Sequence, residues 1–101
     1  MQIIVRTYYG KGTRKLFDLL ENHHTEVERL MRAIDGLVSY SLARNGTGGF
    51  SVTVCRNKRG INQSVQTARR FIAEHAPEMS LDAMDIFEGA VITHFQGEPA
   101  K

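Results

Sequence analysis

The order in which strand-like and helix-like segments follow one another constrains this chain more than any other feature of its sequence. The pattern predicts two amphipathic helices at residues 14–34 and 58–75, and four strands at residues 2–9, 37–44, 50–56 and 86–95. Asn45-Gly46, a strong hairpin signal, joins the two middle strands. The order is therefore strand, helix, strand, strand, helix, strand, which is the split βαβ or ferredoxin-like arrangement.

This order predicts an α+β fold with a four-stranded antiparallel sheet and both helices on one of its faces. Right-handed crossovers place the first and third strands at the centre of the sheet. A chain of 101 residues suits a single core. We expect one ferredoxin-like domain at residues 1–95 and a polar C-terminal tail at residues 96–101.

The face of the sheet that the helices leave bare is poorly suited to water. It would carry alternate residues of the first strand, either Ile3, Val5, Thr7 and Tyr9 or Ile4, Arg6 and Tyr8. Neither set resembles a solvent-exposed strand face, and an apolar patch of this kind marks an interaction surface. A two-fold homodimer with stacked sheets is the simplest arrangement that covers it.

Composition and charge argue against several classes of protein. The net charge is +2, and the main basic cluster, at residues 55–60, is short, so we expect no nucleic-acid partner. No apolar run approaches the roughly 18 residues of a membrane span, so we expect no membrane partner. A single cysteine, Cys55, permits no intramolecular disulfide, and no signal peptide precedes the first strand. These features predict a cytoplasmic protein.

Two segments carry a resemblance to a known family. They are "IDGLVSYSLAR" at residues 34–44 and "GGFSVTV" at residues 48–54. With the order of elements, they resemble the dimeric α+β barrel superfamily, and most closely its small proteins of the antibiotic-biosynthesis-monooxygenase type. The resemblance implies a ligand held between the helices and the sheet of each subunit. It implies a cofactor-independent monooxygenase-like enzyme acting on a small aromatic or polyketide-like compound, or else a non-catalytic ligand-binding or regulatory dimer.

Some members of that family degrade haem with a histidine on the second helix and with Trp and Asn residues nearby. His75 lies near the end of the second predicted helix, which is a loose positional match. The chain contains no Trp, and its first strand contains no Asn. We therefore expect no cofactor, and haem is not favoured.

His23 is the candidate catalytic residue. Advancing by about 100° per residue from Leu16 along one continuous helix places His23 in the middle of the apolar stripe and the adjacent His24 at its margin. His23 is then a hydrogen-bonded core histidine, a residue that lines a hydrated pocket near Tyr8 or Tyr40, or a metal or haem ligand, the last being the least favoured. Adjacent histidines on a helix diverge and do not chelate one ion together, and no His or Cys spacing fits zinc, so we expect no metal site.

Arg6 stands on a central strand, where a charge is normally paired. Glu88 on the neighbouring fourth strand is the candidate partner, and the alternative is that Arg6 anchors an anionic ligand. Tyr8 shares the face of Arg6, and Tyr8 and Tyr40 each combine an apolar ring with a polar tip. The predicted ligand pocket comprises Arg6, Tyr8, His23, Tyr40 and His75.

Two further functions share this order of elements. The RNA-recognition motif stacks bases on aromatic residues of its first and third strands, but Val52 and Val54 stand where this chain would need aromatic residues. Acylphosphatase needs a phosphate-cradling loop after the first strand and an Asn on the third. Gly10 and Gly12 are present, but the third strand contains no Asn. Neither function is favoured.

Overall fold

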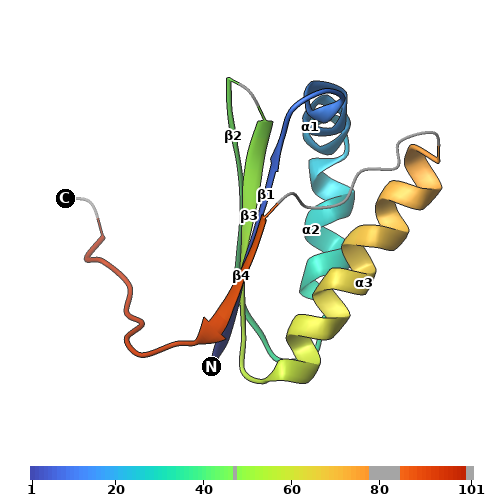
Figure 1. The fold of residues 1–101 in the computed structure, drawn as a ribbon. Helices are drawn as coiled ribbons and strands as arrows, with labels where there is room; N and C mark the ends of the chain where they lie inside the picture. Colours follow the sequence, from blue (N-terminus) through green and yellow to red (C-terminus); the bar gives the residue numbers. More distant parts are fainter. Residues whose placement is uncertain (47, 78–84, 100–101) are drawn as a thin grey trace.

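The computed structural model of the chain describes residues 1–46, 48–77 and 85–99. Its elements are β1 (Gln2–Tyr9), α1 (Thr13–Asn22), α2 (His24–Arg32), β2 (Leu37–Asn45), β3 (Gly48–Cys55), α3 (Lys58–His75) and β4 (Asp85–Ala90). The strands form one antiparallel sheet in the order β2-β3-β1-β4. All three helices lie on the same side of this sheet (Figure 1). The predicted ferredoxin-like fold, with the first and third strands at the centre, is confirmed.

The first predicted helix is wrong in one respect, because the structure divides it into α1 and α2. His23, between the two, has φ −111° and ψ 25°, outside the helical region. Backbone bonding continues across the break: the N–H of His23 donates to the carbonyl of Leu19 at 3.0 Å, and the N–H of Val27 donates to the carbonyl of His23 at 2.9 Å. Residues 22–25, Asn-His-His-Thr, are all weak helix formers, which explains why the break falls here.

The predicted second helix is confirmed as α3, at the predicted bounds. Asn57 precedes it as the N-cap, and its side-chain oxygen accepts a hydrogen bond from the backbone N–H of Gly60 at 3.1 Å. A Cβ at Gly60 would lie only 2.9 Å from the Cβ of Cys55. The absent side chain therefore lets α3 pack closely on β3.

The fourth strand is shorter than predicted, since β4 ends at Ala90 rather than near residue 95. The N–H of Val91 donates to the carbonyl of Met1 at 2.9 Å, next to the start of β1 at Gln2. The residues that follow leave the sheet on the side away from the helices (Figure 1). Ile92 is 98% exposed and Phe95 is 81% exposed.

The core lies between the helices and the sheet, in two clusters of buried side chains. One cluster contains Ile4, Met31, Ile34, Cys55 and Ile61, and the other contains Tyr8, Leu16 and Phe17. Full burial of a Leu or Phe side chain contributes about 1.5–3 kcal/mol. Phe17 packs directly over Gly49, where a Cβ would lie 2.5 Å from the ring.

The helix-free face of the sheet is apolar. Of the two sets of β1 residues considered for it, the structure places Ile3, Val5, Thr7 and Tyr9 there, because Ile4, Arg6 and Tyr8 are buried towards the helices. Phe87, Val5 and Val52 are register partners on β4, β1 and β3 and form a row across this face. Phe87 is 62% exposed, and Phe50 on the same face is 37% exposed. Within the described residues, no helix is both long and apolar enough to cross a membrane.

Candidate functional site

A cavity lies between the helices and the sheet. Its walls are apolar side chains of the helices, such as Leu16 and Phe71, and its floor is the centre of the sheet, with Arg6, Ser51 and Thr53. Its volume is about 50 Å³, enough for a few water molecules. The cavity therefore combines apolar walls with a small number of polar groups on the floor, as ligand sites do.

Arg6 is the most unusual residue of this floor. Its side chain is only 4% exposed, and among the described residues its Nε is a buried nitrogen without a hydrogen-bond partner. The predicted pair with Glu88 is wrong, because the register sets Arg6 opposite Ile86 and sets Glu88 opposite Ile4. Glu88 instead forms an ion pair with Lys58, at the start of α3. The sequence predicted correctly that the first and fourth strands are neighbours. It did not predict their register, in which Glu88 lies two residues away from the partner of Arg6.

The two predicted pocket tyrosines lie with Arg6. The guanidinium carbon of Arg6 is 5.7 Å from the centre of the Tyr8 ring. Tyr40 lines the cavity from β2, two strands away. The pKa of Tyr40 is raised to about 12, chiefly by burial and also by the nearby Tyr8, while Arg6 opposes the rise. At neutral pH the Tyr40 hydroxyl is therefore protonated and able to donate a hydrogen bond.

A larger groove adjoins the cavity, between α1–α2 and the edge strand β2. Its volume is about 550 Å³. The groove and the cavity share the lining residues Leu20, Val27, Met31, Tyr40 and Leu42. A ligand too large for the cavity can thus lie in the groove and direct one end towards Arg6.

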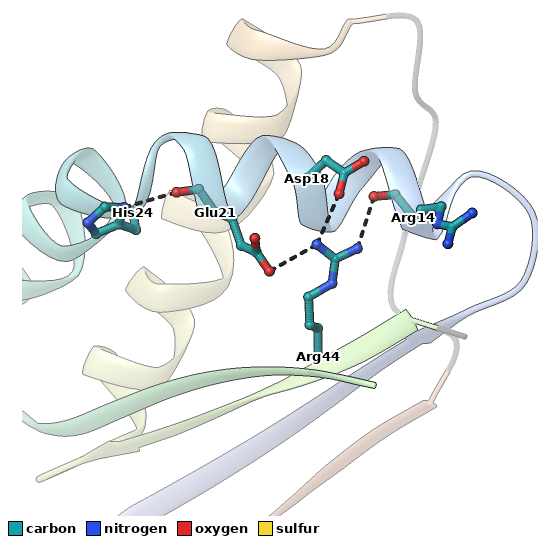
Figure 2. Close-up of polar contacts among 5 residues, drawn as sticks. All are labelled: Arg14, Asp18, Glu21, His24 and Arg44. Carbon is teal, nitrogen blue, oxygen red and sulfur yellow. Dashed lines mark hydrogen bonds and ion pairs between the residues drawn. The ribbon is translucent and has the colours of Figure 1, made fainter. Parts of the chain in front are cut away.

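Arg44 connects β2 to α1 at one end of this groove, and the sequence pattern did not indicate this role. From β2 its guanidinium donates to Asp18 at 3.0 Å and to Glu21 at 2.9 Å, both on α1, as Figure 2 shows. It also donates to the carbonyl of Arg14 at 3.5 Å. The hydrogen bonds to Glu21 and Asp18 raise the pKa of Arg44 above its ordinary value. The available signal was the i,i+3 spacing of Asp18 and Glu21, which puts both carboxylates on one face of a helix.

His23 and His75 are not among the residues that line the cavity or the groove. The prediction that His23 points towards the sheet assumed one continuous helix. The structure breaks this helix at His23, so the prediction no longer holds. The two rings instead contact each other, with centroids 4.6 Å apart, and both contact the ring of Phe71. Glu26 lies between them, 3.5 Å from Nδ1 of His23 and 3.3 Å from Nε2 of His75.

The chemistry of the cavity is that of a cation with hydroxyl groups in an apolar setting. None of the described residues that line it is Asp, Glu or His. Among those residues there is consequently no ordinary general base, but there is a fixed positive charge that lacks a protein counter-ion. Such a set favours a bound anion, because a buried charge without a partner is costly.

Haem does not fit these residues. The cavity is far smaller than a porphyrin, and His75, the positional match to a haem ligand, faces Glu26 rather than the cavity. We therefore assign no part of the chemistry to haem.

Comparisons with known proteins bear on the fold. No protein-family model matches the sequence, and no curated protein matches it either. MupZ from Pseudomonas fluorescens matches in structure with a TM-score of 0.64 and 14% identity, over 86% of this chain and 66% of that chain. NE2512 from Nitrosomonas europaea, a protein of unknown function, matches with a TM-score of 0.65 and 18% identity, over 97% and 94%.

SnoaB from Streptomyces nogalater, a cofactor-independent oxygenase, matches with a TM-score of 0.57 and 10% identity, over 95% of this chain and 96% of that chain. The neighbours also include a mutant of MhuD with two manganese protoporphyrin IX molecules bound per active site and a dimeric ferredoxin-like protein of unknown function from Thermobifida fusca. Identities this low show the fold alone. The chain thus has a ferredoxin-like α+β fold, as its sequence pattern predicts.

Proposed function

We propose that this protein binds a small, largely apolar anion, with the charged end at Arg6 and the apolar body in the groove beside α1 and α2. The observation that carries the proposal is the buried Arg6 side chain, which has no carboxylate partner among the described residues. Tyr8 and Tyr40 line the same space, and the protonated Tyr40 hydroxyl can donate to the same anion. A hydrogen bond to a charged group contributes about 1.5–3 kcal/mol.

We further propose that the ligand is a substrate, a small aromatic or polyketide-like compound that the protein oxygenates without a cofactor. The shared fold with SnoaB supports this proposal. An oxygenase without a cofactor must take the electrons that reduce O₂ from its substrate, and an enolate or phenolate is the electron-rich form that can supply them. Arg6 would stabilise that anion by its fixed charge.

The second candidate is a binding or regulatory protein with the same pocket and no chemistry. It is favoured by the cavity lining, whose described residues include no Asp, Glu or His to remove a proton from a bound compound. In this case the ligand would arrive already ionised, as a carboxylate does at neutral pH.

We also propose that the protein works as a homodimer through its helix-free sheet face. The exposed row that includes Phe87 supports this assembly, as do the projecting side chains of Ile92 and Phe95. A neighbour in the comparisons is a dimeric ferredoxin-like protein. A second copy would supply the apolar cover that this face lacks.

Calorimetric titration with benzoate and with benzamide, its uncharged analogue, tests the anion site. We expect benzoate to bind at least about tenfold more tightly, because only the carboxylate compensates Arg6. Equal affinities, or no binding of either, would overturn the anion site. Oxygen uptake with phenols and 1,3-diketones then separates the two functions: uptake with product formation indicates an oxygenase, and binding without uptake indicates a binding protein.

A further inference from the structure

His23, Glu26 and His75 form a cluster of potential metal ligands outside the cavity. One donor atom from each residue, two imidazole nitrogens and a carboxylate oxygen, lies within 4.8 Å of the other two. His23 directly precedes α2 and Glu26 lies in its first turn, so the two side chains meet at the start of this helix. His75 arrives from the end of α3, 49 residues from Glu26. That separation explains why spacing along the sequence did not indicate the cluster.

Two of the three distances match the geometry of a bound transition-metal ion. Oε2 of Glu26 is 3.5 Å from Nδ1 of His23 and 3.3 Å from Nε2 of His75. Ligands about 2.0–2.2 Å from a tetrahedral ion lie about 3.3–3.6 Å from one another. The two histidine nitrogens lie within 4.8 Å of each other, so they would move closer together when an ion binds.

We propose that His23, Glu26 and His75 bind one divalent transition-metal ion, with zinc as the reference ion. Two imidazoles and one carboxylate are a set that zinc accepts, with a fourth position left for water or another ligand. The three side chains are 37%, 33% and 24% exposed, so an ion can reach them from solvent. Once bound, it would link the α1–α2 junction to the end of α3. The site shares no residue with the anion pocket, so either proposal can fail without the other.

Calorimetric titration of the tag-free full chain with zinc chloride tests the site. We expect one ion per chain, and we expect His23→Ala, Glu26→Gln and His75→Ala each to weaken binding by more than about tenfold, since even loss of an outer-shell partner costs 10–100-fold. His24→Ala is the matched control: His24 is the adjacent histidine, is exposed, and hydrogen-bonds through Nδ1 to the carbonyl of Glu21. Its affinity for zinc should equal that of the unaltered chain.

A second measurement does not depend on the folding of any variant. Nitrogen-15 spectra of the imidazole rings of the unaltered chain should show zinc-induced shifts at Nδ1 of His23 and Nε2 of His75, with His24 and His94 unchanged. Zinc affinity that stays within twofold in the three folded ligand variants would overturn the proposal. Shifts confined to His24 or His94, or no saturable binding, would overturn it as well.

Discussion

The face of the sheet beneath the helices buries an arginine, whereas the face turned away from them exposes phenylalanines. Arg6 is 4% exposed and Phe87 is 62% exposed, although the two are only one position out of register on neighbouring strands. A buried polar group and an exposed apolar patch are the informative departures from ordinary burial. The first departure indicates a ligand and the second a protein partner, so the two faces of one sheet indicate different functions.

The alternation of β1 contributes residues to both faces, and its neighbours β3 and β4 carry Phe50 and Phe87. Along β1, Ile4, Arg6 and Tyr8 are buried, while Ile3 and Val5 are partly exposed on the other face. A shift of one residue would exchange the two sets completely. The register of β1 against β3 and β4 thus determines both the position of Arg6 and the apolar row of the other face.

The largest effect that we expect comes from placing charges on the helix-free face. Phe50→Glu combined with Phe87→Glu should convert the proposed dimer to a monomer, because each central anchor contributes about 2–4 kcal/mol. Sedimentation equilibrium at micromolar concentration measures this change. Gln66→Glu, on an exposed position of α3, is the control that should leave the dimer intact. An unaltered chain that sediments as an 11.4 kDa monomer would exclude the dimer.

The next largest effect concerns the face of the sheet that the helices cover. Leu16 is 0% exposed, so Leu16→Ala should lower the free energy of unfolding by about 2–5 kcal/mol through lost burial and a residual cavity. Urea unfolding measures it. The adjacent Lys15 is exposed, and Lys15→Ala should change stability by no more than about 0.5 kcal/mol. Similar losses in the two variants would mean that α1 does not pack on the sheet through Leu16.

Removal of the Arg6 charge should affect stability much less. Because no ion pair of Arg6 exists among the described residues, we expect Arg6→Met to change the free energy of unfolding by less than about 1 kcal/mol or to raise it. Breaking a buried pair would cost about 3–5 kcal/mol. Glu88→Gln should also cost no more than about 1 kcal/mol, since its pair with Lys58 is partly exposed. A loss of 3 kcal/mol or more in either variant would contradict the account of Arg6.

The smallest effect is confined to alkaline solution. Since burial raises the pKa of Tyr40 from 10.0 to about 12, the unfolded chain ionises this phenol before the folded chain does. The contribution of Tyr40 to stability is therefore complete below pH 10 and falls as the pH rises from 10 towards 12. Unfolding at stepped pH values should show a shallower fall for Tyr40→Phe. An identical alkaline fall in both chains would show that Tyr40 is not buried beside the cavity.

The fold could be predicted from the sequence because its signals are local. The apolar spacing of α3, the extended β1 and the Asn45-Gly46 turn each act over a few residues, and together they restrict the topology to very few alternatives. The break at His23 was harder to predict, because weak helix formers lower helix stability without forbidding a helix. The length of β4 depends on where its neighbour β1 begins. The residues of β4 themselves carry no information about that position.

The site could be predicted only in part, because it depends on register and on contacts distant in the sequence. The three predicted pocket residues on strands, Arg6, Tyr8 and Tyr40, do lie together around one cavity. The two predicted histidines do not line it. A helical wheel carries no information across the break at His23, whereas His75 is the last residue of the unbroken α3 and faces Glu26. His75 meets Glu26 through the packing of α3 against α2, which the sequence pattern did not indicate.

Calorimetric titrations at pH 7 test the anion site directly when they compare benzoate binding by the unaltered chain and by Arg6→Met. We expect Arg6→Met to stay folded and to lose about 1.5–3 kcal/mol of benzoate affinity, while its weak affinity for benzamide is unchanged. Lys58→Met removes a positive charge outside the cavity and should bind benzoate as the unaltered chain does. Equal benzoate affinity in the unaltered chain and in folded Arg6→Met would contradict the claim that Arg6 anchors an anionic ligand.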